Sequence, residues 1–206
     1  MKLLIATTNP GKILEYRQIL SVLSVETISL KELGLENIKV EEDGETFEEN
    51  AIKKAKTFCE AAKIPVLADD SGLEIDFLSG EPGVKSRRWP GYEATDEELI
   101  ELALGKLKGV EREKRGAQLR CCIAISFPGE EQIYLTEGIL RGIITESPIS
   151  IIPGFPFRSI FFLPEINRVL GELTLEEETE IAHRKKAMEK MIPILKEKLM
   201  RSEVTN

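Results

Sequence analysis

The spacing of hydrophobic and polar residues along the chain alternates between the pattern of strands and the pattern of helices. An apolar run at 2–6 predicts a strand, and apolar residues then recur at helical spacing over 13–23. A second apolar run at 25–30 predicts another strand. A Thr-Phe-Glu-Glu capping box at 46–49 begins a helix that we expect to continue to about residue 62. The first third of the chain therefore alternates strands with helices.

The middle of the chain is richer in strand patterns. An apolar strand at 65–68 leads to Asp-Asp-Ser-Gly at 69–72, which we interpret as a turn before a further strand at 73–77. The later elements are expected at these positions: a capped helix at 95–107, strands at 120–127 and 132–139 joined as a hairpin, a stiff loop at 153–156, a strand at 159–163, and a long C-terminal helix opened by a capping box at 174–177.

This order of elements predicts an α/β fold. The hairpin requires antiparallel pairing, so the sheet is expected to be mixed rather than purely parallel. We expect a single domain over residues 1–206, with flanking helices that form two lobes around a central cleft.

Composition and charge narrow the class of protein. The formal net charge of −8 disfavours general binding to nucleic acids or anionic membranes, so an anionic ligand must be met by local cations. The apolar start of the chain is too short for a signal peptide or a membrane span, which predicts a cytoplasmic protein. Cys59, Cys121 and Cys122 lack metal-ligand spacing and are interpreted as reduced core residues.

The loop after the first strand has the chemistry of a phosphate site. It reads Thr7-Thr8-Asn9-Pro10-Gly11-Lys12 and leads into a helix, whose N-terminal N–H groups and dipole favour anions. The loop lacks the second glycine of a P-loop. By itself it is equally consistent with a polar turn.

Acidic residues supply candidate metal ligands. Asp69 and Asp70 follow an apolar strand, where open α/β sheets place ligand-binding groups, and their oxygens suit Mg²⁺ completed by phosphate oxygens. The alternative is a solvated turn in which one Asp caps its own backbone. Glu41, Glu42 and Asp43 form an acidic run that either supplies a further metal carboxylate or is simply a solvated loop.

Two basic segments also allow two interpretations each. Lys54 lies near Asn50 by helical spacing and either pairs with it or faces a phosphate. His183 is the only histidine of the chain and is followed by Arg184. The pair is either an exposed part of the last helix or reaches back to hold a nucleotide.

Taken in order, several segments resemble the inosine triphosphate pyrophosphatase family, whose members hydrolyse non-standard purine triphosphates. The similarity spans nearly the whole chain. The segments that carry it are Ala6 to Lys12 with Glu15, Asp43 to Phe47 with Glu49-Asn50-Ala51 and Lys54-Ala55, Ala68 to Leu73, Gly80 to Val84 with Ser86 and Arg88, and His183-Arg184.

The resemblance implies an activity and a set of site residues. The enzyme would be a Mg²⁺-dependent homodimer that converts inosine or xanthosine triphosphates to monophosphate and pyrophosphate, with Asp70 as general base beside Asp69. Glu42 and the Asp pair would bind Mg²⁺. The residues implied for the substrate are Thr7, Thr8, Asn9, Pro10, Gly11, Lys12, Lys54, Ser71, Phe155, Pro156, Phe157, Arg158, Glu178, His183 and Arg184.

Two departures fall in the part of the family pattern that handles the base. Relatives read Gly-Phe-Gly-Tyr-Asp-Pro where this chain has Gly-Phe-Pro-Phe-Arg-Ser at 154–159, and they carry a lysine where it has Glu178. Arg158 and Glu178 therefore suggest an ion pair of reversed polarity. Arg158 would donate to O6 and N7 of a 6-oxopurine and Glu178 would accept from its N1–H. The alternative is drift at a site that has lost base selectivity.

Two other functions stay open. One is a nucleotide-binding or sensing protein that kept the phosphate loop but lost turnover. The other is a pyrophosphatase of altered base specificity, acting on other nucleotides. The presence of Lys12, Lys54, Asp69 and Asp70 favours the enzyme, since a sensor has no need of an acid that activates water.

Overall fold

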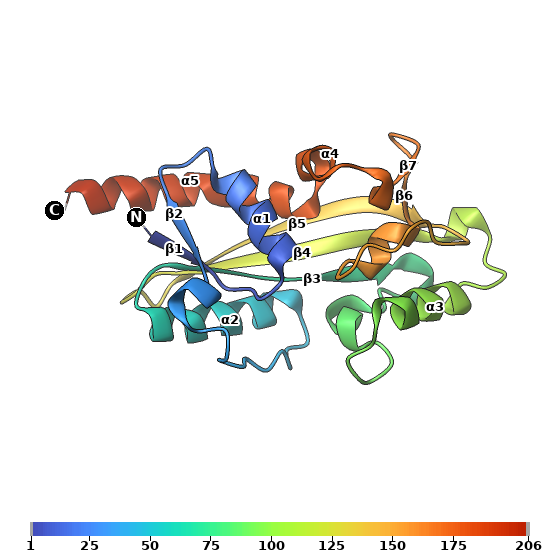
Figure 1. The fold of residues 1–206 in the computed structure, drawn as a ribbon, viewed down its shortest axis with the longest axis horizontal. Coiled ribbons are helices and arrows are strands. Elements are labelled where there is room, and N and C mark those ends of the chain that lie inside the picture. The colour runs from blue at the N-terminus through green and yellow to red at the C-terminus, as the bar shows by residue number, and fades with distance from the viewer. Residues whose placement is uncertain (1, 205–206) are drawn as a thin grey trace. The chain divides into compact units, whose positions relative to one another are not determined.

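The computed structural model describes residues 2–204 of the chain and their side chains as far as residue 198 (Figure 1). The helices and strands follow the chain in this order: β1 (Lys2–Ile5), α1 (Pro10–Leu20), β2 (Glu26–Ser29), α2 (Phe47–Ala62), β3 (Val66–Ile75), α3 (Asp96–Lys106), β4 (Gly116–Ser126), β5 (Ile133–Ile144), β6 (Phe161–Leu163), β7 (Arg168–Val169), α4 (Leu175–Ile181) and α5 (His183–Val204). Within residues 2–204, no helix is long and apolar enough to cross a membrane.

The strands form a mixed seven-stranded sheet in the order β2-β1-β3-β4-β5-β6-β7. β1 runs parallel to β2, with Leu4 opposite Ile28, and parallel to β3, with Leu4 opposite Val66. β6 is antiparallel to both β5 and β7. The mixed α/β class expected from the hydrophobic pattern is confirmed.

The chain divides into two compact units. The first unit contains the residues up to Asp70, the segment Cys121–Gly138 and the chain from His183 onward. The second unit contains Ser71–Arg120 and Ile139–Ala182. β3, β4 and β5 each contribute residues to both units.

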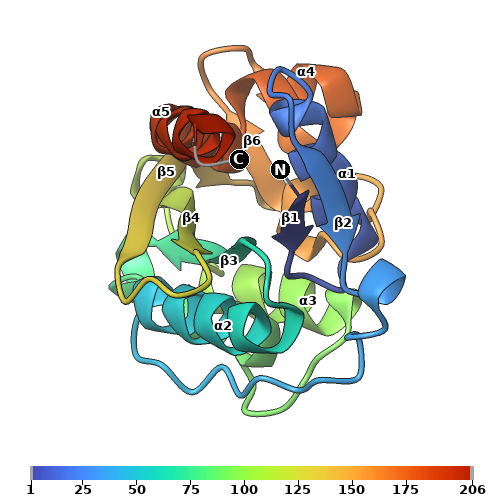
Figure 2. The ribbon, with the colours of Figure 1, turned by 90° about the vertical axis from the view of Figure 1, so that its left-hand side faces the viewer.

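In the first unit, helices cover both faces of the strands. α1 and α5 lie on one face, and α2 lies on the other (Figures 1 and 2). Leu3, Ile5 and Leu67 pack with residues of α1 and α5. Since alternate residues of a strand face opposite sides, Leu4 and Val66, which are also fully buried, face α2.

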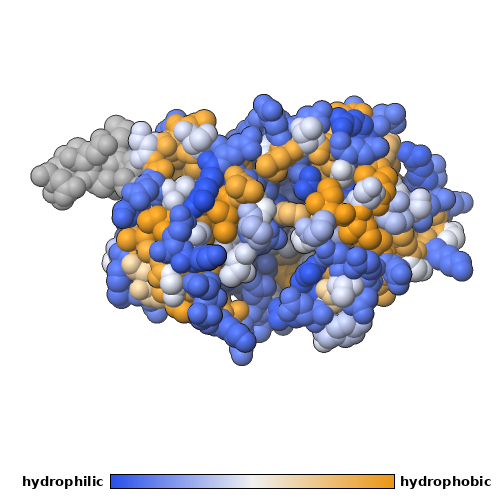
Figure 3. All heavy atoms as spheres, in the orientation of Figure 1, coloured by the Kyte–Doolittle hydropathy of each residue, from blue (hydrophilic) through white to orange (hydrophobic). Residues whose placement is uncertain are grey.

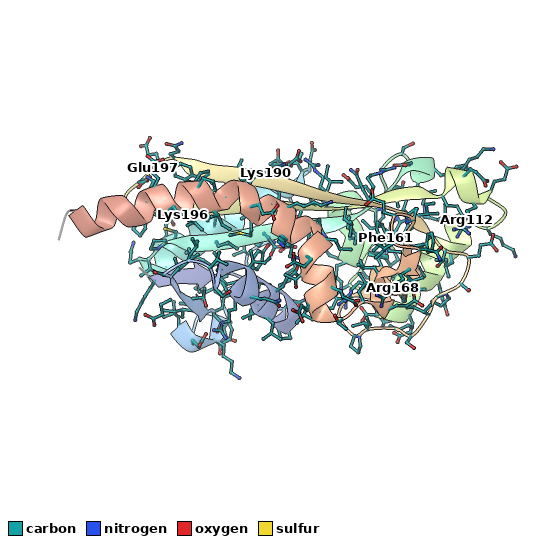
Figure 4. The ribbon with its side chains drawn as sticks, turned by 90° about the horizontal axis from the view of Figure 1, so that it is seen from above. Arg112, Phe161, Arg168, Lys190, Lys196 and Glu197 are labelled. Carbon is teal, nitrogen blue, oxygen red and sulfur yellow. The ribbon has the colours of Figure 1, made fainter. Side chains whose placement is uncertain are left out.

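The second unit has its own apolar core, to which α3, the far ends of β3 to β5, and β6 contribute. Phe161 of β6 is fully buried in this core (Figure 4). Its ring lies so close to Gly142 that a Cβ there would come within 2.4 Å of it. Arg115 is buried beside this core, and its guanidinium donates to the carbonyls of Leu107, Ile144 and Thr145 at 2.9, 2.7 and 2.5 Å. This satisfies donors that burial would otherwise leave unpaired.

Three local expectations are wrong in a way that matters for the site. Residues 69–72 do not form a turn, because β3 continues through them from Val66 to Ile75. The strand expected at 159–163 begins only at Phe161, after a 3₁₀ turn at Pro156–Ile160. The long C-terminal helix is interrupted at Ala182, whose extended backbone separates α4 from α5.

On the face drawn in Figure 3, hydrophobic and hydrophilic side chains are intermixed. Lys190, Lys196 and Glu197 extend from α5 (Figure 4), and Lys190 donates to the carbonyl of Glu137 at 2.8 Å. Cys59, Cys121 and Cys122 are free and buried, which confirms their interpretation as reduced core residues.

Candidate functional site

The loop after β1 is shaped by its own polar side chains. Asn9 is the N-cap of α1, and its Oδ1 accepts hydrogen bonds from the N–H groups of Gly11 and Lys12 at 2.9 and 3.3 Å. Thr7 Oγ1 accepts from the Asn9 N–H at 3.2 Å. Pro10 occupies the first turn of the helix, where its missing N–H costs nothing. The loop therefore delivers Lys12 to a defined place at the helix N-terminus.

The continuity of β3 explains how two adjacent acids are both buried. Asp69 is 2% exposed and Asp70 is 7% exposed. Neighbouring residues of a strand point to opposite faces of the sheet. Asp69 accordingly meets side chains of α1 and α5, whereas Asp70 meets side chains of α2. The separation limits the repulsion that a shared turn would have imposed.

On the face of α1 and α5, Asp69 is held by two cations. Lys12 Nζ lies 2.8 Å from Asp69 Oδ2, and Arg184 Nε lies 3.5 Å from the same oxygen. Arg184 is held in turn by Glu15, whose Oε2 lies 3.1 Å from its NH1. Burial alone would raise the pKa of Asp69, but Lys12, Arg184 and Lys54 lower it far below its usual range. Asp69 is therefore ionised at neutral pH.

On the face of α2, Asp70 is held by an amide and an ammonium. Asn50 Nδ2 donates to Asp70 Oδ2 at 2.9 Å, and Lys54 Nζ lies 3.5 Å from Asp70 Oδ1. Glu42, from the loop before α2, lies 2.7 Å from the same Lys54 nitrogen. Lys54 thus pairs with acids rather than with Asn50. Two carboxylates of separate segments share one ammonium.

The pKa values of the two aspartates are shifted in opposite directions. Burial raises the pKa of Asp70, and Glu42 adds to the effect, although Lys54 and Asn50 oppose it. Burial lowers the pKa of Lys54, but Asp70, Glu42 and Asp69 outweigh it and raise the pKa, so the ammonium stays charged. A carboxylate with a raised pKa beside fixed cations is suited to accept a proton.

His183 and Arg184 begin α5 and are buried, at 5% and 6% exposure. The interpretation of these two residues as an exposed part of the last helix is therefore wrong. Burial lowers the pKa of His183 well below its usual range, and Arg184 and Lys12 lower it further. His183 Nδ1 is buried with no hydrogen-bond partner among the described residues. The chain needs Gly138 here, since a Cβ on it would come within 2.0 Å of the His183 carbonyl.

The residues assigned to the base lie in the second unit. Arg158 NH2 and Glu178 Oε2 form an ion pair, and their side chains are nearly buried. The Arg158 guanidinium also lies 5.3 Å from the centre of the half-buried Phe155 ring. Pro156 and Phe157 are buried, and Phe157 belongs to the apolar core of the unit. Of the two aromatic residues, only Phe155 keeps exposed surface for a base.

The loop that carries Phe155 is tied to α3. Asp96, in the first turn of α3, accepts a hydrogen bond from the Gly154 N–H at 2.6 Å through Oδ2. Its other oxygen lies 2.5 Å from Arg87 NH1. Gly154 has a φ of 82°, which favours glycine. Asp96 therefore fixes the backbone directly before Phe155.

The structure brings most of the expected phosphate and metal residues together in the first unit, and it adds two that the sequence did not assign. Glu15 holds Arg184, and Asn50 holds Asp70. Both lay within the segments of family resemblance, but only their burial shows that they serve charged neighbours. Ser71 follows Asp70 in β3 and is half-buried. Among the described side chains, no cluster of three or more His, Cys, Asp or Glu residues has metal-site spacing.

Known proteins match this chain over nearly its full length. Residues 3–194 match the Ham1 family. The chain is 43% identical to the dITP/XTP pyrophosphatase of Bacillus subtilis (strain 168) over 192 residues, which cover 93% of this chain and 96% of that protein.

Solved structures agree with the sequence match. The Staphylococcus aureus Ham1 protein superposes with a TM-score of 0.83 at 34% identity, over 96% of this chain and 100% of that one. A HAM1 protein from Coxiella burnetii gives 0.84 at 34% identity, over 96% and 99%. The resemblance found in the motifs is thereby confirmed, and the chain belongs to the Ham1 family.

Proposed function

We propose that this protein hydrolyses non-standard purine nucleoside triphosphates, such as dITP, ITP and XTP, to the monophosphate and pyrophosphate. Relatives named dITP/XTP pyrophosphatase support the reaction and the substrate class. The observation that carries the proposal is the position of Asp70, a buried carboxylate with a raised pKa, between Lys54 and Asn50.

The triphosphate would be bound by the cations and helix terminus of the first unit. Lys12 lies at the N-terminus of α1, where the dipole favours anions, and its ammonium is already ordered by Asp69. Thr8 is exposed beside it. Asn9 uses its Oδ1 for the helix cap, so a phosphate would meet its Nδ2 donor.

The charge of the first unit's site fits a divalent cation. Three cations face four carboxylates there: Lys12, Lys54 and Arg184, against Glu15, Glu42, Asp69 and Asp70. A polyanionic triphosphate would add to this negative excess unless further positive charge came with it. Mg²⁺ is commonly held by one or two carboxylates together with substrate phosphates, so a cluster of three protein acids is not needed.

Glu42 and Asp70 are the residues that fit the metal best. Both reach one ammonium, so their oxygens already converge on a single positive charge. Asp69 was also assigned to the metal, but its Oδ2 is occupied by Lys12 and Arg184. We assign Asp69 to ordering these two cations. Bound Mg²⁺ would neutralise charge on the phosphate oxygens and on the leaving pyrophosphate.

Asp70 is the residue that would accept the proton. A water oxygen attacks the α-phosphorus and the bond from that phosphorus to the α–β bridging oxygen breaks. The water proton passes to Asp70, and pyrophosphate leaves. Lys12 and Lys54 stabilise the charge that develops on the phosphate oxygens. Asn50 and Lys54 hold the Asp70 carboxylate in place for the proton transfer.

Base selection is assigned to Arg158 and Glu178. The ion pair of reversed polarity expected from the sequence forms within the second unit. Arg158 uses NH2 for this pair, and a guanidinium carries further N–H donors that would meet the O6 or N7 of a 6-oxopurine. Phe155, against which the guanidinium packs, supplies the aromatic surface.

A substrate panel tests the proposal. The purified protein is incubated with Mg²⁺ and each of dITP, ITP, XTP, the standard purine triphosphates and the pyrimidine triphosphates, and pyrophosphate is measured. We expect pyrophosphate release from dITP, ITP and XTP, and near loss of that release in Asp70→Asn. Binding without release would identify a nucleotide sensor instead. A homodimer, implied by the family resemblance, is tested by light scattering on the same sample.

A further inference from the structure

Asn50 connects two segments of the candidate site that are distant in sequence. It lies in the first turn of α2 and is 1% exposed. Its Nδ2 donates to Asp70 Oδ2 at 2.9 Å. Its Oδ1 accepts from the Gly44 N–H at 2.8 Å. One carboxamide therefore joins β3 to the loop that carries Glu42.

The orientation of this carboxamide is fixed by chemistry. A backbone N–H is only a donor, so the group that faces Gly44 must be the carboxamide oxygen. The nitrogen then faces Asp70, whose ionised carboxylate is only an acceptor. Both ends of the amide are satisfied in a single orientation. This is how a buried polar side chain specifies one geometry rather than several.

Gly44 is shaped to this contact. A Cβ on Gly44 would come within 2.7 Å of Asn50 Oδ1 and 2.9 Å of Glu49 Cβ. Its φ lies outside the left-handed range, so the requirement for glycine comes from the close approach and not from the backbone conformation. The loop can lie this near Asn50 only because position 44 has no side chain.

A second contact between the same loop and α2, an exposed ion pair, can be compared with the buried hydrogen bonds of Asn50. Asp43 and Lys53 form an ion pair at 2.6 Å, but both side chains are largely exposed, and the pair does not include Asp70 or Glu42. Exposed pairs of this kind contribute little to stability. The buried amide of Asn50, in contrast, contacts the candidate metal carboxylate of Asp70 directly and also bonds Gly44, which lies two residues after Glu42.

We infer that Asn50 is a positioning residue that holds Glu42 and Asp70 at a fixed separation for one divalent cation. The inference rests on the proposed metal-dependent reaction. Asn50 restrains Asp70 Oδ2, which leaves Oδ1 directed to the Lys54 ammonium that Glu42 also contacts. Through Gly44 it keeps the Glu42 segment in reach. Asn50 itself does not bind the metal.

The test measures Mn²⁺ binding to the resting full-length protein by electron paramagnetic resonance, without nucleotide. Asn50→Leu removes both hydrogen bonds at nearly constant volume. Gly44→Ala keeps Asn50 and disturbs the contact from the loop side. We expect each to weaken Mn²⁺ binding by about 10- to 100-fold, as for other residues that orient metal ligands. Lys53→Ala, the matched control on the exposed ion pair, should leave the affinity within about twofold.

Steady-state kinetics give a second readout that a purely structural role would not change. In both variants kcat at limiting Mg²⁺ should fall by about tenfold or more and recover as Mg²⁺ is raised, while KM for the nucleotide stays within about threefold. If Asn50→Leu does not fold, Gly44→Ala decides the question.

Three results would overturn the inference: unchanged Mn²⁺ affinity in Gly44→Ala, an equal loss in Lys53→Ala, or no Mn²⁺ binding by the unaltered protein. If the unaltered protein releases no pyrophosphate but the variants still bind Mn²⁺ more weakly, the proposed reaction fails and the role of Asn50 stands.

Discussion

The two units of the molecule organise their buried charges differently. In the first unit, Asp69 pairs with both Lys12 and Arg184, and Arg184 also pairs with Glu15. In the second unit, Arg158 and Glu178 form a pair that lies against the Phe155 ring. We call Lys12, Asp69, Arg184 and Glu15 the linked set. Reversing one of its charges would leave several buried partners without an opposite charge, whereas exchanging the charges of Arg158 and Glu178 keeps an anion facing a cation. The polarity reversal inferred from the sequence falls at this second pair.

The largest expected effect comes from removing the proton acceptor of the first unit. Asp70→Asn keeps the shape of the side chain but cannot accept a proton at neutral pH. We expect kcat to fall by about 1,000-fold, within the range for loss of a general base. Pyrophosphate release from dITP measures it. A loss below about tenfold would remove Asp70 from the proposed role, provided that the melting temperature is unchanged.

The linked set should also be essential for stability. Asp69→Asn leaves Lys12 and Arg184 without their shared anion in a buried site, and we expect a loss of about 3 kcal/mol in the free energy of unfolding at pH 7. Urea denaturation measures it. Asp43→Asn, which breaks the exposed pair with Lys53, is the control and should cause no measurable loss. Equal effects would mean that burial of the set is unimportant.

The stability difference between the unaltered protein and Asp69→Asn should depend on pH. The pKa of Asp69 is lowered in the folded state, so the stability it contributes is present above its unfolded pKa of about 3.9 and is lost as the pH falls further. The difference in unfolding free energy between the unaltered protein and Asp69→Asn should therefore shrink as the pH is lowered from about 5 to about 2, as the Asp69 carboxylate becomes protonated. A difference that grows on acidification contradicts the assignment.

The pair of the second unit should affect selectivity rather than turnover. Arg158→Ala removes the donor assigned to a 6-oxopurine, so kcat/KM for dITP should fall about tenfold more than for dATP. Equal losses would refute a role in base choice. Arg158→Asp with Glu178→Lys provides the control: if the pair is only structural, each single variant is damaged and the double variant recovers stability with no change in base preference.

A smaller effect is expected where the second unit positions its loop. Asp96→Ala removes the acceptor of the Gly154 N–H, which restrains the backbone before Phe155. We expect KM for dITP to rise about fivefold, the equivalent of one hydrogen bond of about 1 kcal/mol, with kcat retained. Steady-state kinetics measure it. An unchanged KM would show that Asp96 serves the packing of α3 alone.

Hydrophobic spacing and helix caps were enough to predict most of the order of elements and the mixed sheet, but not β7 or the break between α4 and α5. They could not predict that β3 continues through Asp69 and Asp70, because adjacent acids in a strand are unfavourable unless distant residues neutralise them. Those partners, Lys12, Lys54 and Arg184, lie on three different helices. Similarly, the spacing of Asn50 on α2 did not show that its side chain joins Gly44 to Asp70.

The central claim is that the first unit directs water to the α-phosphorus, with Asp70 as the proton acceptor. Hydrolysis of dITP in ¹⁸O-labelled water, followed by mass spectrometry of the products, tests it most directly. The account predicts one labelled oxygen in deoxyinosine monophosphate, unlabelled pyrophosphate, and loss of both products in Asp70→Asn. Label in pyrophosphate, or release of inorganic phosphate with deoxyinosine diphosphate, would place the attack at another phosphorus and contradict it.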